Sequence, residues 1–232
     1  MVKQIEINMI DFEKFIEELN LIINNPNPLC NKIVGYTVTN TQIHILYNYE
    51  NNKCSSLYNL IHQKKLIIPI ENLKIYVYSI VQMMDFYHKK SILITYNDLK
   101  LQNLFISNDG KNLFADIFGF STSFFSNKTK GNKYSGTISH MCPELFLGEK
   151  FDFPFDIYSF GIILYEIFSS KIPYEGMKEK DIITGVVKGI RPDFNCLRSD
   201  TPKEYIDLIK KCLEKDPLKR PSTNDILYFL KE

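Results

Sequence analysis

The sequence lacks a dominant charge and a long apolar run. Its 28 lysines and arginines nearly balance its 27 aspartates and glutamates, so the formal net charge is +1. No strong field is therefore present to attract nucleic acid or anionic lipid. No uninterrupted apolar stretch reaches the roughly 18 residues that a membrane span needs. Charged residues interrupt residues 1–18, and we therefore expect no signal peptide and no membrane or nucleic-acid partner.

The cysteines lack any C-x-x-C motif. They are odd in number and widely spaced: Cys30, Cys54, Cys142, Cys196 and Cys212. This pattern favours reduced thiols and a cytoplasmic location. Alanine occurs once, at Ala115, whereas isoleucine, asparagine and lysine abound, as is typical of an AT-rich genome. Apolar residues still make up 44% of the chain, which is enough to build a folded core.

Residues 1–49 have the pattern of a small unit with one helix and two or three strands. Apolar positions recur at helical spacing through residues 11–24, and the stretch 24–28 contains two prolines that end the helix. Residues 33–38 and 42–49 are rich in residues that favour strands, and they predict two short strands joined at 39–41.

Residues 50–232 are mainly helical in pattern. The predicted elements are helices at 56–63 and 73–90, a loop at 92–106, a hairpin turn at 108–110, an exposed loop at 119–140, a buried central helix at 158–168, a helix started by a capping box at Thr201–Glu204, and a last helix from Ser222. The sequence therefore predicts an α+β protein whose larger part is helical.

Five short motifs follow one another in this body. They are YNDLKLQN at 96–103, DIFG at 116–119, GTISHMCPE at 136–144, DIYSFG at 156–161, and DP at 216–217 with RPS at 220–222. Each is weak alone, but together and in this order they resemble the protein-kinase family from about Phe15 to the end of the chain. The resemblance implies a bilobal kinase-like fold with a truncated N-lobe, residues 1–49, and a mainly helical C-lobe, residues 50–232.

The resemblance also assigns roles to individual residues. Asp98 lies where kinases carry the catalytic base, Lys100 where a lysine contacts phosphate, and Asn103 and Asp116 where the magnesium ligands lie. Thr137, in the Gly-Thr segment, would suit Ser/Thr specificity.

Four further residues resemble structural positions of the family. Glu144 is expected to pair with Arg220, and Glu18 would be the glutamate of the first helix. Asp156 would accept hydrogen bonds from the backbone around Asn97.

Several departures from the family pattern predict a protein without catalysis. Only 17 residues precede Glu18, against the order of 40 that a glycine-rich hairpin and a lysine strand need. No G-x-G-x-x-G occurs, and Lys3 is at most a remnant of the strand lysine. Residues 96–98 lack the usual arginine, and the DIFG motif has one residue too many. We therefore expect a pseudokinase with no nucleotide, cofactor or metal.

An active enzyme is the alternative. It would be a minimal Ser/Thr protein kinase that uses Asp98, Lys100, Asn103 and Asp116, with the missing lobe rebuilt by residues 1–10 or by a partner chain. Such an enzyme would require ATP and magnesium.

Residues 156–167 and 171–176 most resemble the receptor-interacting protein kinases and their partner, the mixed lineage kinase domain-like pseudokinase. A body without that protein's N-terminal helical bundle is similar to its poxvirus-encoded homologues. This resemblance implies a viral decoy in the host cytoplasm. It would bind host receptor-interacting protein kinase 3 and block necroptotic signalling.

A group of aromatic residues supplies a candidate partner surface. Its members are Phe146, Phe151, Phe153, Phe155 and Tyr174. Their density suggests an exposed apolar patch, although packing beneath the loop at 119–140 is an open alternative. His140 and Cys142 are too few for a metal site and are expected to be a satisfied histidine and a buried thiol. The other histidines, His44, His62 and His88, are interpreted as isolated.

Overall fold

The structure is a computed structural model that describes residues 2–7, 12–30, 33–47, 55–91, 99–107, 110, 113–115, 137–149 and 152–231. Several predicted site residues lie outside these ranges, namely Asp98, Asp116 and Phe151. The backbone of Lys3 and Glu18 is described, but their side chains are not.

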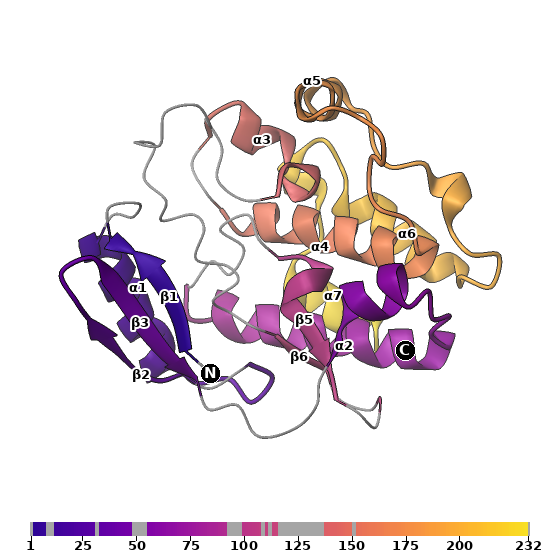
Figure 1. The fold of residues 1–232 in the computed structure, drawn as a ribbon. Helices are drawn as coiled ribbons and strands as arrows, with labels where there is room; N and C mark the ends of the chain where they lie inside the picture. Colours follow the sequence, from indigo (N-terminus) through magenta and orange to yellow (C-terminus); the bar gives the residue numbers. More distant parts are fainter. Residues whose placement is uncertain are drawn as a thin grey trace.

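The N-terminal part is a three-stranded antiparallel sheet packed against one helix. The elements are β1 (Val2–Glu6), α1 (Phe12–Asn24), β2 (Ile33–Val38) and β3 (Gln42–Tyr47), with strand order β1-β3-β2 (Figure 1). On β3, Ile43 lies opposite Ile5 of β1 and Val38 of β2. Because side chains alternate along a strand, Ile43 and Ile45 both point into the core that α1 closes with Phe15. The predicted helix and both predicted strands are confirmed.

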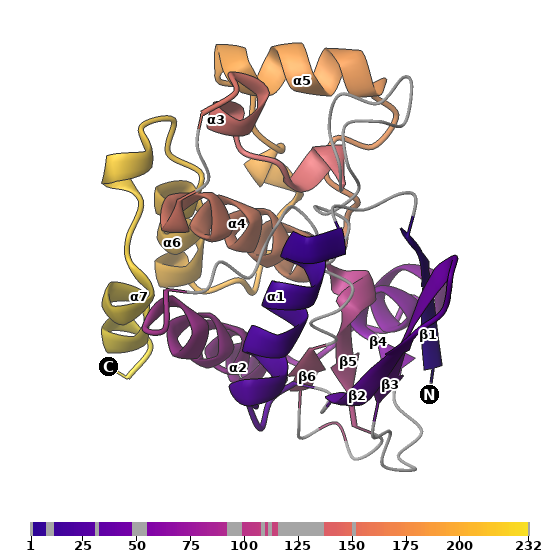
Figure 2. The same cartoon turned by 90° about the vertical axis from the view of Figure 1, so that its left-hand side faces the viewer.

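The body is a bundle of helices with a second small sheet. Its helices are α2 (Ile70–His88), α3 (Pro143–Phe146), α4 (Phe153–Ser169), α5 (Glu179–Lys188), α6 (Lys203–Cys212) and α7 (Thr223–Phe229). The sheet has the order β4-β5-β6, from Ser55–Ser56, Leu104–Ile106 and Leu113–Ala115. Helix α4 runs through the middle of the bundle, with α5 above it and α2 below it (Figure 1; a second view is Figure 2).

Helix α4 confirms the predicted central helix, and its sequence explains its place. Every residue from Phe155 to Ser169 is buried, as expected for a helix that is apolar on all sides. The Asp152 side chain accepts a hydrogen bond from the Phe153 amide at 2.8 Å and starts the helix. A β-carbon at Gly161 would lie 2.7 Å from Cys212 Cβ, so glycine allows α4 and α6 to touch.

The capping box predicted at Thr201–Glu204 is wrong. Helix α6 begins after Pro202 without a side-chain cap, and the Thr201 hydroxyl is buried with no hydrogen-bond partner among the described atoms. A real capping box starts α7, where Ser222 Oγ accepts from the Asp225 amide and Asp225 Oδ2 accepts from the Ser222 amide. The exposed Ser222 is free to turn its hydroxyl toward the helix end, whereas Thr201 is held inside the core.

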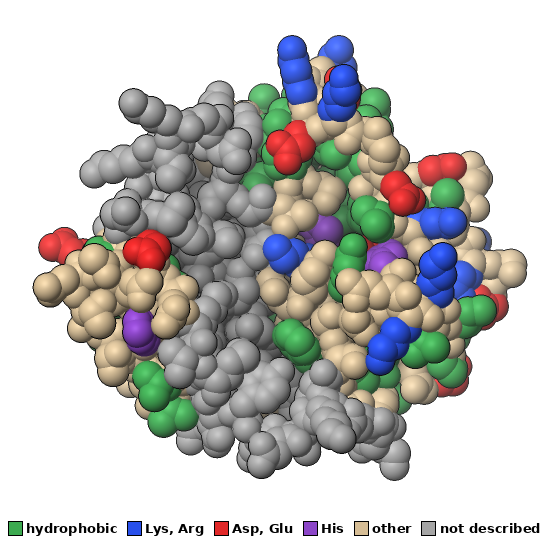
Figure 3. All heavy atoms as spheres, in the orientation of Figure 1, with side chains coloured by type: hydrophobic (Ala, Val, Ile, Leu, Met, Phe, Trp, Pro, Cys, Tyr) green, Lys and Arg blue, Asp and Glu red, His purple; other side chains and the backbone are tan. Residues whose placement is uncertain are grey.

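The structure differs from the predicted elements at two further stretches, 56–63 and 92–106. The stretch 56–63 forms a π-helical turn at Asn59–Gln63, preceded by strand β4. The predicted loop 92–106 ends in β5, which pairs with β6 as the hairpin signal indicated, and Gly110 has φ +69° in the connection. Within the described helices, none is long and apolar enough to cross a membrane. Charged side chains of both signs are scattered over the body, with lysines gathered over α5 (Figure 3).

Candidate functional site

The segment that carries the first motif is anchored on both sides of Lys100. Leu99 and Leu101 are fully buried, so the side chain between them is turned toward the opposite side. The Lys100 ammonium donates a hydrogen bond to Thr137 Oγ1 at 3.2 Å. This contact joins the motif at 96–103 to the Gly-Thr motif, which lies 37 residues further along the chain.

Asn103 is positioned by a short 3₁₀ helix that leads into β5. The Asn103 amide donates to the Lys100 carbonyl at 3.0 Å, and the helix Leu101–Asn103 ends at Leu104. Leu104 pairs with Ala115 in the β5–β6 register. The hairpin therefore brings together the ends of the two segments that carry Asn103 and Asp116.

The magnesium ligands that the family resemblance assigns are an amide from Asn103 and a carboxylate from Asp116. Oxygen donors of this kind are those that magnesium prefers, and the β5–β6 register brings their segments together. The donor chemistry of these two side chains therefore suits the ion. Asp98 and Asp116 themselves lie outside the described residues, so the structure places two of the four predicted catalytic residues.

Glu144 and Arg220 form the buried ion pair that the sequence predicted. Arg220 donates from Nη1 to Glu144 Oε2 at 3.0 Å and from Nη2 to Oε1 at 2.6 Å. The same guanidinium also donates to the Pro154 and Glu214 carbonyls, and it lies over the Tyr158 ring at 5.1 Å. Because both oxygens and most N–H groups are satisfied, this pair can remain charged inside the core.

Cys142 lies beside this pair, and its burial determines the chemistry of its thiol. Burial and the adjacent Glu144 carboxylate raise the pKa of the Cys142 thiol, so it stays protonated and is a poor metal ligand. Among the described residues, no group of three or more metal-ligating side chains occurs.

Asp156 lies at the start of α4 and contacts His88. His88 Nε2 is 2.7 Å from Asp156 Oδ2, and both side chains are nearly inaccessible. The His88 ring packs on Phe153, with 4.6 Å between ring centroids. The interpretation of His88 as isolated is therefore wrong. The expected contact of Asp156 with the backbone near Asn97 falls outside the described residues.

A second buried carboxylate, Glu166, lies between two histidines. His62 Nε2 is 2.7 Å from Glu166 Oε1, and His140 Nε2 is 3.5 Å from Glu166 Oε2. Burial opposes ionisation of Glu166, yet the interactions with His140 and His62 hold the pKa of this carboxyl below its usual value. The interpretation of His62 as isolated is wrong as well, because its partner is 104 residues away in the chain. The sequence contained one sign of this pairing: Glu166 is a charged residue inside an otherwise apolar helix, and such a residue needs a buried partner.

The aromatic patch proposed as a partner surface is largely internal. Phe146, Phe155 and Tyr174 are buried, so the expectation of an exposed patch is wrong for these three. Phe153 is half-buried against His88. The physical reason is that Phe153 and Phe155 belong to the first turn of α4, where a helix turns them to different sides and directs Phe155 into the core.

The sheet-and-helix unit beside a helical body, with Glu144–Arg220, Asp156 and the Lys100–Thr137 contact, defines a protein-kinase-like α+β fold. The sequence of residues 1–229 matches the protein kinase domain family. The chain therefore belongs to the protein kinase family.

Several relatives of this chain carry kinase names. A probable serine/threonine-protein kinase of Dictyostelium discoideum is 30% identical over 100% of this chain and 25% of its own length. A LIM domain-containing probable serine/threonine-protein kinase of the same organism is 33% identical over 97% of this chain and 22% of its own length. Rat protein kinase C delta type is 32% identical over 62% of this chain and 20% of its own length. The chain thus spans a quarter or less of the length of each of these relatives.

Proposed function

We propose that this chain transfers a phosphoryl group from ATP to serine or threonine hydroxyls of a protein. The observation that carries the proposal is the hydrogen bond from Lys100 to Thr137 at 3.2 Å. It fixes the segment that would present the acceptor hydroxyl against the segment that carries Asp98. The names of the relatives support the same reaction.

Each residue has one task in the proposed reaction. Asp98 accepts the proton of the acceptor hydroxyl, and the Lys100 ammonium steadies the negative charge near the transferred phosphoryl group. Asn103 and Asp116 would hold magnesium, which neutralises charge on the phosphates. Positioning is the main contribution of the protein, since it is worth about 7–11 kcal/mol in well-oriented reactions.

A second candidate is favoured by the departures in the motifs. DIFG has an additional residue between Asp116 and Gly119, the residue before Asp98 is not arginine, and the sequence contains no G-x-G-x-x-G. On this proposal the chain is a pseudokinase decoy in the host cytoplasm. It would bind receptor-interacting protein kinase 3 and prevent signalling to the mixed lineage kinase domain-like protein.

One assay separates the two candidates. The purified chain is incubated with γ-³²P-labelled ATP, magnesium and a general Ser/Thr acceptor protein. We expect transfer that Asp98→Asn lowers by about 10²–10⁴-fold, whereas Asp207→Asn, on the exposed side of α6, leaves it unchanged.

Absence of transfer, together with a melting temperature that does not respond to millimolar ATP and magnesium, would refute the enzyme proposal. Capture of receptor-interacting protein kinase 3 by the same inactive material would then support the decoy.

A further inference from the structure

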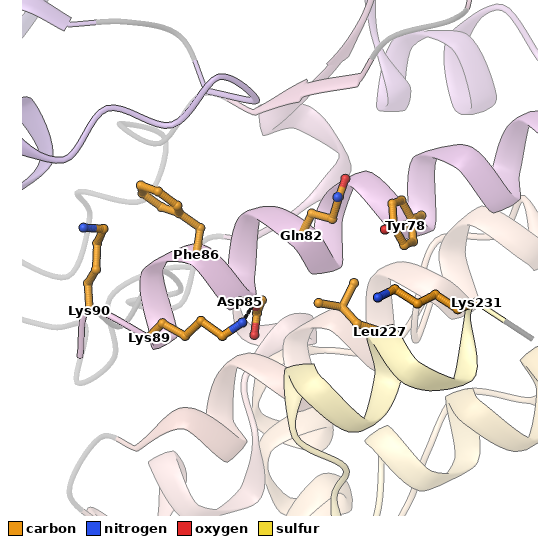
Figure 4. Close-up of a pocket in the computed structure, with 8 residues that line it drawn as sticks. All are labelled: Tyr78, Gln82, Asp85, Phe86, Lys89, Lys90, Leu227 and Lys231. Atoms are coloured by element: carbon orange, nitrogen blue, oxygen red, sulfur yellow. Dashed lines mark ion pairs between the residues drawn. The ribbon is translucent and has the colours of Figure 1, made fainter.

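Two adjoining hollows lie along the outer side of α2. The first has a volume of about 610 Å³ (Figure 4). It is lined by α2 from Tyr78 onward and by Lys89 and Lys90 just after that helix, with Leu227 and Lys231 contributed from α7 and the residues after it. The second has a volume of about 370 Å³ and includes Phe153, Pro154 and Leu218. The hollows share Asp85 and Lys89, so they form one continuous depression, which we name the α2–α7 groove.

The side chains that line the first part of the α2–α7 groove carry an excess of positive charge. Its first hollow contains three lysines, Lys89, Lys90 and Lys231, and one carboxylate, Asp85. Asp85 is already engaged, because Lys89 Nζ lies 2.7 Å from its Oδ2 and Thr223 Oγ1 donates to its Oδ1 at 3.1 Å. In the part of the chain that the structure describes, Lys90 and Lys231 have no acidic partner. Figure 4 shows the Lys89–Asp85 ion pair on α2 and places Lys231 beside Leu227.

Apolar surface accompanies these charges. The Lys90 ammonium lies 5.1 Å from the centre of the Phe86 ring, and Tyr78 and Leu227 line the same hollow. At the other end of the groove, Leu218 is 89% exposed between prolines of the second hollow. An apolar side chain so exposed is favourable to bury when a partner covers it.

We propose that the α2–α7 groove binds an extended acidic peptide segment of a protein partner. Acidic side chains of the segment pair with Lys90 and Lys231, and an apolar side chain of the same segment covers Leu218 and Phe153. From Tyr78 to His88, α2 rises about 15 Å at 1.5 Å per residue, which matches about five residues of extended chain at 3.3 Å each. This length favours a peptide over a compact anion. The proposal goes beyond phosphoryl transfer, and it holds whether or not the chain is catalytic.

The probes are fluorescein-labelled eight-residue peptides with four glutamates in one half and two leucines and a proline in the other, made in both orders. Binding to the full chain is followed by fluorescence anisotropy. We expect the peptide with one of the two orders to bind. The double variant Lys90→Glu with Lys231→Glu should lower the affinity for that peptide by at least about tenfold, because the variant removes two attractions and adds two repulsions. The matched control is Lys178→Glu with Lys188→Glu. It makes the same change of net charge on exposed positions at α5, on another side of the body, and should leave binding intact.

Two comparisons make the proposal falsifiable at its apolar end. Leu218 is 89% exposed, so we expect Leu218→Ser to preserve folding and to weaken binding of the acidic-leucine peptide. A glutamate-only peptide of equal charge, or a single-stranded oligonucleotide of equal charge, should bind more weakly than the acidic-leucine peptide. Equal binding of either polyanion, equal loss in the α5 control, or no binding of either peptide order at millimolar concentration would overturn the proposal.

Discussion

The N-terminal unit and the helical body are stabilised in different ways. The core of the N-terminal unit consists of Ile5, Phe15, Leu19, Ile33, Ile43 and Ile45, and none of its described buried side chains is charged. The body buries a much larger apolar cluster and encloses Glu144, Asp156, Glu166 and Arg220 within it. Apolar burial is non-directional, whereas a buried ion pair requires one geometry. The core of the body therefore contains charged groups that must be paired, whereas the core of the N-terminal unit is held by apolar packing and strand pairing.

The largest expected effect comes from breaking a buried ion pair of the body. Glu144→Ala leaves the Arg220 guanidinium buried without its carboxylate, and we expect a loss of about 3–5 kcal/mol in the free energy of unfolding. Urea denaturation measures this loss. The control Asp200→Ala removes the exposed partner of Arg198 and should not move the urea midpoint. A Glu144→Ala midpoint equal to that of the control would contradict the role given to the pair.

A cavity in each core tests whether the two regions unfold separately. Ile45→Ala and Ile163→Ala each remove a fully buried side chain, at a cost of about 2–5 kcal/mol in the region affected. We expect Ile45→Ala to accelerate amide exchange in β1, β2 and β3 while α4 keeps its protection. Ile163→Ala should lower protection throughout the body. Equal acceleration of α4 by both variants would show one cooperative unit instead.

Two glycine variants compare a crowded contact with an open one. Gly161→Ala forces a β-carbon against Cys212 and Leu213 and should destabilise the protein by about 1–3 kcal/mol through overpacking. Gly35→Ala, on β2, meets no atom within 4 Å and should be neutral or slightly stabilising. Thermal melting of both variants checks the order, and a Gly35→Ala loss as large as that of Gly161→Ala would refute it.

The smallest effect is a difference in pH dependence. The folded-state pKa of Glu166 lies below its usual 4.5, so the unfolded chain takes up this proton first as pH falls. The stabilisation is present above pH 4.5 and is lost as pH decreases through the folded-state pKa. In E166Q the slope of unfolding free energy against pH below 4.5 should be shallower by at most about 1.4 kcal/mol per pH unit, the value for one proton. Chemical denaturation between pH 3 and pH 6 measures it, and an equal or steeper slope in E166Q would refute the prediction.

The sequence predicted the structure well where a motif or a pattern of apolar residues was present. The apolar stretch around Phe160 predicted α4, and the motif residues Glu144 and Arg220 predicted the ion pair, although 76 residues separate them. Local pattern was insufficient for His62 and His88, because their partners are brought near only by the packing of α2 and the preceding turn on α4. It also misjudged Phe155, because the density of aromatic residues suggested an exposed patch, whereas the first turn of α4 directs this side chain into the core.

The contacts of His88 and Lys100 have a joint consequence for the chain between them. His88 is fixed to the first turn of α4 through Asp156, and Lys100 is fixed to Thr137. Both attachment points, His88 and Lys100, are therefore held by contacts to other segments of the body. The number of residues that connect these two points is therefore restricted. An insertion or deletion between them would have to be accommodated by the connecting residues, or it would break one of the two contacts.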